Sequence, residues 1–277
     1  MWGLGDNIYQ RPFVELLARG NLVFLDTPWP EVYEDISNVR FVRGTRNLRT
    51  QMKNIQRQHP GRWAVAPPRL PPLRIHYNLN SRSIPEEMAQ CFRVGDKLTL
   101  SLPPVKGSWP QHDKPIAIVR PVTVRREWLN SARNPLPEYV AEIAGRLMAT
   151  HHVISLADLC SEETLVGTAP PCHAAYLQGE VTIDRLLELI AAADVLVGGV
   201  GWIVPAAVAA RKRAFVVLGG QGGHNAPAKL LAPWWEHRLT FAQPQRFCLC
   251  NNMRHECSTK AIPNLTNLFS HFIAQAG

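Results

Sequence analysis

The sequence predicts an α/β protein built from two Rossmann-like βα domains that face a cleft. Apolar runs of strand length alternate with helical patterns along most of the chain. Between residues 194 and 225, two such runs flank a small-residue helix, and each run is followed by a glycine-rich loop. Prolines and a glycine crowd residues 102–115, a composition typical of a linker. We therefore expect an N-terminal domain over residues 1–110 and a C-terminal domain over residues 111–277.

In the N-terminal part, the glycine loop Gly3-Leu-Gly-Asp-Asn-Ile-Tyr leads directly into a helical pattern over residues 8–18. The next expected elements are a strand at 21–26, a short helix at 30–36, a strand at 39–42, a helix at 48–58, a strand at 73–77, a helix at 84–91 and a strand or extended segment at 97–102.

In the C-terminal part, Ile116-Ala-Ile-Val has the composition of a buried strand. The elements expected after it are a helix at 137–150, a strand at 152–156, a helix at 182–192 and the βαβ unit of residues 194–225. Open parallel sheets bind ligands at the carboxyl ends of their strands, where backbone N–H groups are accessible. A small molecule that carries phosphate is the ligand this pattern favours. The alternative is that the glycines are only turn residues: Gly198, Gly199, Gly201, Gly219, Gly220, Gly222 and Gly223.

The chain carries a net charge of +8, and the excess is unevenly distributed. Residues 40–74 contain nine Lys or Arg and no Asp or Glu. A field of one sign favours a polyanionic partner, with nucleic acid first and a phosphorylated glycolipid second, although an incidentally basic surface is the alternative. The residues expected to contact it are Arg43, Arg46, Arg49, Lys53 and Arg57, the last three forming a stripe on the helix expected at 48–58.

No run of 18 apolar residues occurs, and the N-terminus lacks the pattern of a signal peptide. We expect a cytoplasmic protein without a transmembrane segment, and reduced thiols at its six cysteines.

Gly3-Leu-Gly-Asp at the start and Gly-Gly-x-Gly-Trp-x-x-Pro-x-Ala over residues 198–207 resemble glycosyltransferases of the GT-B fold. More narrowly, they resemble the heptosyltransferase family of lipopolysaccharide synthesis and related bacteriophage sequences. The resemblance implies that the N-terminal domain holds the acceptor and the C-terminal domain the nucleotide sugar. It also implies that Asp6 is the catalytic base. This chain departs from the family in being shorter, in lacking the first strand and in having Gly201-Trp202 where the family has Ser or Thr after glycine.

The chemistry of an inverting sugar transfer agrees with this resemblance. It needs a carboxylate that takes the proton of the acceptor hydroxyl, and positive charge or N–H donors on the departing diphosphate. Asp6 can serve as the base, or it can simply cap the first helix. Trp202 can stack on the nucleotide base or pack the core. The residues expected at the donor are Arg120, Arg125, Arg126, Gly199, Gly201, Trp202, Gln221, Gly222, Gly223 and His224. No Asp-x-Asp is present, and we expect no catalytic metal.

Near the C-terminus, four soft ligands fall within ten residues: Cys248, Cys250, His255 and Cys257. They fit a structural zinc site by type, but their spacing is tighter than in common zinc motifs. A disulfide or free thiols are the alternatives.

The leading hypothesis is a nucleotide-sugar-dependent glycosyltransferase. The basic N-terminal domain favours a nucleic-acid acceptor, such as a hydroxymethylated pyrimidine in phage DNA, held by arginines with Trp63 or Tyr77. The rival acceptor is a lipopolysaccharide or another phosphorylated glycan. A non-enzymatic nucleic-acid-binding protein is a rival of another class. An NAD-dependent oxidoreductase is weaker, because no complete G-x-G-x-x-G follows a strand.

Overall fold

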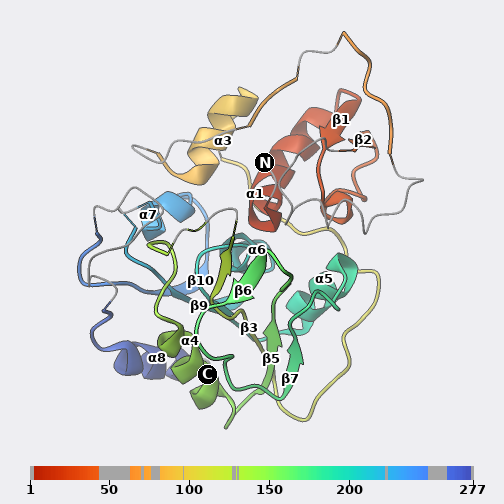
Figure 1. The fold of residues 1–277 in the computed structure, drawn as a ribbon. Helices are drawn as coiled ribbons and strands as arrows, with labels where there is room; N and C mark the ends of the chain where they lie inside the picture. The colour runs from red at the N-terminus through yellow and green to blue at the C-terminus, as the bar shows by residue number, and fades with distance from the viewer. Residues whose placement is uncertain are drawn as a thin grey trace.

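A computed structural model describes residues 3–43, 63–69, 72–75, 82–95, 97–126, 129, 131–221, 224–248 and 261–275 (Figure 1). The N-terminal half contains the helix α1 (Leu4–Ala18), the strands β1 (Val23–Asp26) and β2 (Val39–Val42), the 3-10 helix η1 (Pro30–Val32) and the helix α3 (Ile84–Phe92). β1 and β2 pair in parallel. Each of these elements confirms one expected from the sequence, and the helix expected at 48–58 lies outside the described residues.

The C-terminal half is organised around a six-stranded sheet in the order β10-β9-β8-β3-β5-β7, and every pair in it is parallel. Its strands are β3 (Ile116–Val119), β5 (His152–Leu156), β7 (Ala174–Tyr176), β8 (Val195–Gly198), β9 (Arg213–Val217) and β10 (Arg238–Ala242). The chain adds strands outward from β3 to β7 and then outward from β8 to β10. This is the order of a Rossmann sheet, and its topological switch point lies between β3 and β8.

Helices cover both faces of this sheet, because successive residues of a buried strand point to opposite faces. On one face, Ile116 and Ile118 of β3 pack in the cluster that includes α5 (Ile183–Ala192) and α6 (Ile203–Ala209). On the other face, Ala117 and Val119 pack in the cluster of α4 (Pro137–Leu147) and α8 (Leu265–Ala274). Figure 1 shows the two layers, with α4 and α8 below the sheet and α1 beyond α6.

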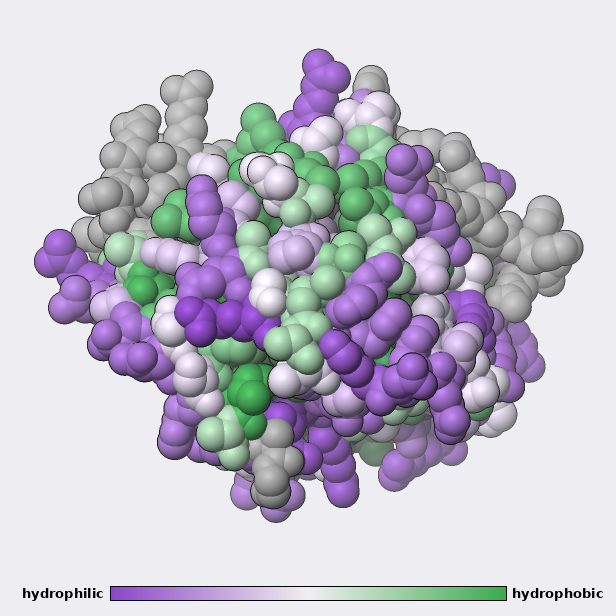
Figure 2. Space-filling model, turned by 90° about the horizontal axis from the view of Figure 1, so that it is seen from below, coloured by the Kyte–Doolittle hydropathy of each residue, from purple (hydrophilic) through white to green (hydrophobic). Residues whose placement is uncertain are grey.

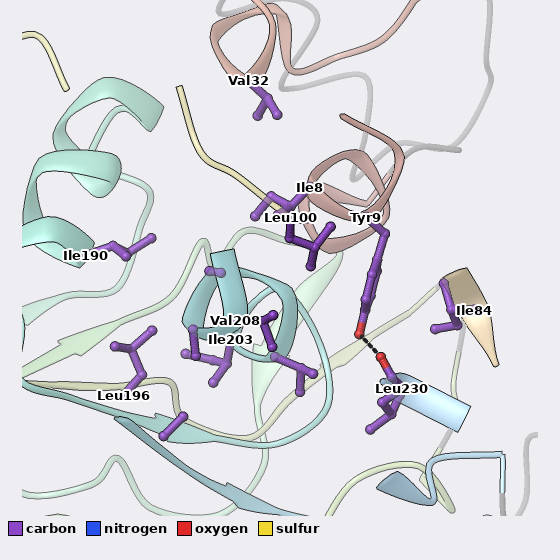
Figure 3. Close-up of a cluster of buried hydrophobic side chains, with 14 of the residues drawn as sticks. Ile8, Tyr9, Val32, Ile84, Leu100, Ile190, Leu196, Ile203, Val208 and Leu230 are labelled. Atoms are coloured by element: carbon purple, nitrogen blue, oxygen red, sulfur yellow. Dashed lines mark hydrogen bonds between the residues drawn. The ribbon is translucent and has the colours of Figure 1, made fainter. Parts of the chain in front are cut away.

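The hydrophobic core continues from the C-terminal half into the N-terminal half. Ile8 of α1 and Ile203 of α6 belong to one buried cluster, and the two helices pack against each other (Figure 3). The Tyr9 hydroxyl donates to the Leu230 carbonyl at 2.8 Å, and its ring stacks on Trp235. Leu230 ends the short helix α7 (Pro227–Leu230). Burial and one directional bond therefore fix α1 on the C-terminal half.

The proline-rich segment is held against both halves. Lys106 pairs with Glu34 of the N-terminal half and with Asp184 of α5, the latter at 3.0 Å. The Arg185 guanidinium donates to the Ser108 carbonyl at 3.0 Å. This segment therefore contacts both halves of the chain, and the domain boundary at residues 110–111 stays a prediction.

The strand expected at 73–77 is absent from its described part, residues 73–75, and residues 76–77 lie outside the described residues. Residues 97–102 form no strand, which leaves the alternative of an extended segment. Four strands escaped the sequence analysis, namely β4 (Thr123–Arg125), β6 (Glu163–Leu165), β7 and β10. The first three are only three residues long and half-buried in most positions, so they show neither a full apolar run nor an alternation.

The surface is mixed. Figure 2 views the molecule from below and shows hydrophilic side chains around smaller hydrophobic areas. Among the described residues, no helix is long and apolar enough to cross a bilayer.

Three histidine rings stack at the amino end of the sheet. His152 lies between His112 and His173, with ring centroids 3.7 Å and 4.9 Å away. Burial, and then the neighbouring His112, His173 and Lys114, lower the pKa of His152 below its ordinary 6.5.

We therefore expect the free energy of unfolding to fall as the pH drops below about 6.5, because the unfolded chain then binds more protons than the folded one. Urea unfolding at pH 7 and pH 5 measures this. His152→Phe keeps an aromatic ring in the stack and should reduce the difference in the free energy of unfolding between pH 7 and pH 5. An unchanged difference would mean that other groups cause the pH dependence.

Candidate functional site at the switch point of the sheet

Arg120 and the loop after β8 meet at the carboxyl edge of the sheet. Arg120 follows β3, and its backbone N–H donates to the Val197 carbonyl of β8 at 2.8 Å. A Cβ atom on Gly201 would lie 2.9 Å from Nη1 of Arg120. A Cβ on Gly198 would lie 3.0 Å from the Cβ of Arg120. The absence of side chains at these glycines therefore lets the guanidinium lie directly on the loop at the switch point.

The charge at this edge is positive and poorly balanced. Burial lowers the pKa of Arg120 to about 10; the nearby Glu163 acts in the opposite direction, while Arg125 and Arg133 lower it further. Arg120 is thus still a cation at neutral pH. Two further guanidiniums and one carboxylate act on Arg120, so the charge around it favours an added anion.

Glu163 organises this cluster. Its Oε1 accepts from the Thr123 hydroxyl at 2.8 Å, and its Oε2 accepts from Nε of Arg125 at 3.3 Å. The antiparallel pair of β4 and β6 places Arg125 opposite Glu163. Glu163 was missed by the sequence analysis, because a single acidic residue in an unrecognised three-residue strand gives no signal.

The N-terminus of α1 lies against the same loop. A Cβ on Gly5 would lie 3.1 Å from both N and Cα of Trp202. The next residue, Asp6, is half-buried and accepts the Gly3 N–H through Oδ2 at 3.2 Å. The first turn of α1 therefore packs on the glycine loop after β8, with Asp6 next to the contacting Gly5, and the loop expected at the start of the chain is helical from Leu4 onward.

The second glycine loop packs against the chain itself. A Cβ on Gly219 would lie only 2.3 Å from the Arg133 carbonyl oxygen. In the loop after β8, a Cβ on Gly199 would likewise lie 3.2 Å from Cδ of Pro135. The Gln221 N–H donates to the Ala132 carbonyl at 3.1 Å. At these positions the interpretation as packing glycines is supported. They let residues 132–135, which include the cationic Arg133, cover the edge of the sheet.

Comparison with known proteins identifies this arrangement at the level of the fold. No protein-family model matches the sequence, and no curated protein matches it. Among solved structures, the iron-containing dodecameric glycosyltransferase TibC from enterotoxigenic E. coli H10407 matches with a TM-score of 0.62 at 11% identity, over 99% of this chain and 73% of TibC. TibC in complex with ADP-D-β-D-heptose matches with a TM-score of 0.59 at 10% identity, over 100% of this chain and 75% of TibC.

The E. coli ADP-heptose lipopolysaccharide heptosyltransferase II matches with a TM-score of 0.61 at 13% identity, over 100% of this chain and 96% of the enzyme. The chain has the GT-B fold. The fold class expected from the sequence is thereby confirmed.

The remaining residues expected at the donor occupy different positions on the GT-B frame. Arg126 is exposed, and its N–H donates to the Glu162 carbonyl at 2.7 Å. Trp202 packs partly buried against the main core, which favours the packing role for its ring. His224 is half-buried and its N–H donates to the Gln221 carbonyl at 2.9 Å. Gly222 and Gly223 lie outside the described residues.

Most residues of the predicted acceptor site and of the predicted zinc site fall outside the described residues. Arg43 is exposed directly after β2. Cys248 is buried, and its N–H donates to the Gly220 carbonyl at 2.7 Å. Among the residues that the structure describes, no group of three or more His, Cys, Asp or Glu could hold a metal ion. The residues outside it are Arg46, Arg49, Lys53, Arg57, Cys250, His255 and Cys257.

Proposed function

We propose that the protein is a glycosyltransferase that uses a nucleoside diphosphate sugar. The observation that carries the proposal is the meeting of Arg120, the glycine loop after β8 and the start of α1 at the switch point of a Rossmann sheet. The carboxyl edge of the sheet, with Arg120, can bind an anion, and the Asp6 carboxylate lies near it. Binding at such an edge suits a diphosphate, because half-buried guanidiniums can neutralise it by charge-assisted hydrogen bonds.

In the proposed reaction, Asp6 takes the proton from an acceptor hydroxyl as its oxygen attacks C1 of the sugar. The bond between C1 and the diphosphate oxygen breaks, and the nucleoside diphosphate leaves with the bonding electrons. Arg120, supported by Arg125 and Arg133, stabilises the negative charge on the leaving group. Direct displacement inverts the configuration at C1. No metal ion is needed for these steps.

The first donor to test is an adenosine diphosphate sugar. TibC was solved with ADP-D-β-D-heptose, and heptosyltransferase II carries ADP-heptose in its name. At 10–13% identity these proteins share the fold with this chain, so the nucleotide and the sugar are parts of the proposal that need direct measurement.

For the acceptor, we favour a phosphorylated glycan of the lipopolysaccharide type, in line with heptosyltransferase II. DNA is the second candidate, and the basic segment 40–74 is the observation in its favour. Both acceptors are polyanions, so charge alone does not separate them.

The test is release of the nucleoside diphosphate from ADP-, UDP-, GDP- and CDP-sugars, with phosphorylated lipopolysaccharide core or hydroxymethylated DNA as acceptor. We expect one donor to be consumed faster when the right acceptor is added, and mass analysis to find the sugar on that acceptor. No release from any donor would contradict the proposed activity. DNA binding that weakens steeply with salt, without release, would favour the non-enzymatic alternative.

We further propose that the cysteine and histidine group near the C-terminus binds one structural metal ion, with zinc as the first candidate from its ligand types. Elemental analysis of the purified protein tests this. About one zinc per chain, lost in Cys257→Ser, is the expected result. Protein that carries no metal, with all thiols titratable, would contradict it.

A further inference from the structure

A buried network of polar side chains lies beside the turn that carries Asp6. The side chains of Asn7, Gln10, Thr27 and Tyr33 are at most 3% exposed. Oδ1 of Asn7 accepts from the Thr27 hydroxyl at 2.7 Å and lies 3.0 Å from the Tyr33 hydroxyl. Nε2 of Gln10 donates to the Tyr33 hydroxyl at 3.1 Å. The network joins the first turn of α1 to the segment between β1 and β2.

Asn7 connects this network to the cap of the helix. Its Nδ2 donates to the Gly3 carbonyl at 2.9 Å, and its backbone N–H reaches the same oxygen at 3.1 Å. The N–H of Gly3 is bound by Asp6. Asp6 therefore binds the N–H of Gly3, and Asn7 binds its carbonyl oxygen. The positions of the Asp6 and Asn7 side chains are coupled through Gly3.

The network is a costly way to fill a core. A buried polar atom that loses its partner still bears the cost of its desolvation, whereas apolar side chains of the same shape carry no such cost. Burial also raises the pKa of Tyr33 far above its ordinary range, so its hydroxyl keeps its proton. What the network gains is directional control. Its bonds fix the rotamer of Asn7 and the orientation of the turn that it caps.

We propose that Asn7, oriented by Thr27 and Tyr33, is a positioning residue that holds the Asp6 carboxylate in place for the acceptor hydroxyl. The inference rests on the proposed transferase function. The positioning residues do not touch the reacting atoms. They act through Gly3 and Asp6, and also keep Gly5 seated on the loop after β8.

The test is a double-mutant cycle between Tyr33→Phe and Asp6→Asn, with sugar transfer and thermal unfolding measured for each variant. Tyr33→Phe removes one hydroxyl, whose hydrogen bonds are to Asn7 and Gln10, although the Asp6 carboxylate also acts on Tyr33 electrostatically. We expect kcat to fall about 10-fold or more, with KM for the donor within about two-fold, because small displacements of a reacting group cost rate rather than binding. In the Asp6→Asn background, Tyr33→Phe should cause no further loss. Thr27→Val should behave in the same way.

Tyr139→Phe is the matched control. Tyr139 lies on α4, and its hydroxyl accepts a partly buried hydrogen bond from the Ile262 N–H at 3.2 Å. It should lower stability without changing kcat. An equal loss of kcat from Tyr33→Phe in both backgrounds, or no loss in either, would overturn the positioning role and leave a stabilising one.

A second readout separates this inference from the proposed activity. The ¹³C resonance of the Asp6 side-chain carboxyl, assigned with Asp6→Asn, should move in Tyr33→Phe and stay in Tyr139→Phe. An unmoved resonance would overturn the inference even in an active enzyme. If the wild-type protein releases nothing from any donor but the resonance moves, the proposed activity fails while the structural coupling stands.

Discussion

Asp6→Asn is expected to lower kcat for sugar transfer by about 10²–10⁴-fold, the usual contribution of a positioned general base. An amide cannot take up the proton of the acceptor hydroxyl. Its carbonyl oxygen can still accept the Gly3 N–H that Oδ2 of Asp6 accepts at 3.2 Å, so the cap and the fold are preserved. Initial rates at saturating donor and acceptor measure the effect, with the melting temperature recorded alongside.

Glu15→Gln is the control for this variant. Glu15 lies on the same helix and pairs with Arg19 at 3.5 Å, on the exposed side. It should leave kcat within about two-fold, since exposed pairs contribute little even to stability. If Asp6→Asn keeps most of its activity, Asp6 is a helix-capping residue only and another base must be found.

Gly219→Ala is expected to destabilise the protein by about 3 kcal/mol or more, at the upper end of the usual cost of overpacking. The added Cβ would lie 2.3 Å from the Arg133 carbonyl oxygen and 2.7 Å from that of Ala132. Both are backbone atoms, so the chain over residues 132–133 must shift to relieve the clash. That shift breaks the bond from the Gln221 N–H to the Ala132 carbonyl. Thermal unfolding should show a drop of roughly 5 °C or more.

Gly20→Ala provides the matched comparison, because nothing lies within 4 Å of a Cβ at that position. Its melting temperature should stay within about 2 °C of the wild type. Equal melting temperatures for both variants would mean that the segment over the sheet edge yields freely, and that Gly219 is no packing requirement.

The sequence was most informative where local chemistry and packing agree. The βαβ unit of residues 194–225 was predicted because both its strands are buried on two faces and read as continuous apolar runs. The start of α5 follows from Thr182, whose hydroxyl accepts the Arg185 N–H at 3.3 Å. Ser83 and Glu86 form a capping box at α3 in the same way.

The candidate site was predicted only in part, because it is assembled from segments far apart in the sequence. Arg120 was proposed from its place after a strand, and Asp6 from the resemblance of the N-terminal Gly-Leu-Gly-Asp to a glycosyltransferase family. Nothing local indicates that Gly5 contacts Trp202, or that Glu163 would join Arg125. Asn7 gives no signal either, since its partners Thr27 and Tyr33 are 20 and 26 residues away.

Direct calorimetric binding of ADP to the wild type, Arg120→Ala and Arg146→Ala tests the central claim most directly. Arg146 is a half-exposed arginine on α4 that pairs with Glu142, and its removal should leave the affinity within about two-fold. Arg120→Ala should weaken binding roughly 10- to 100-fold, because a charge-assisted bond to a phosphate contributes about 1.5–3 kcal/mol. If ADP does not bind the wild type, the same three proteins are compared with UDP, GDP and CDP. Equal affinity of the Arg120→Ala protein and the wild type for whichever nucleotide binds would contradict a diphosphate site at the switch point.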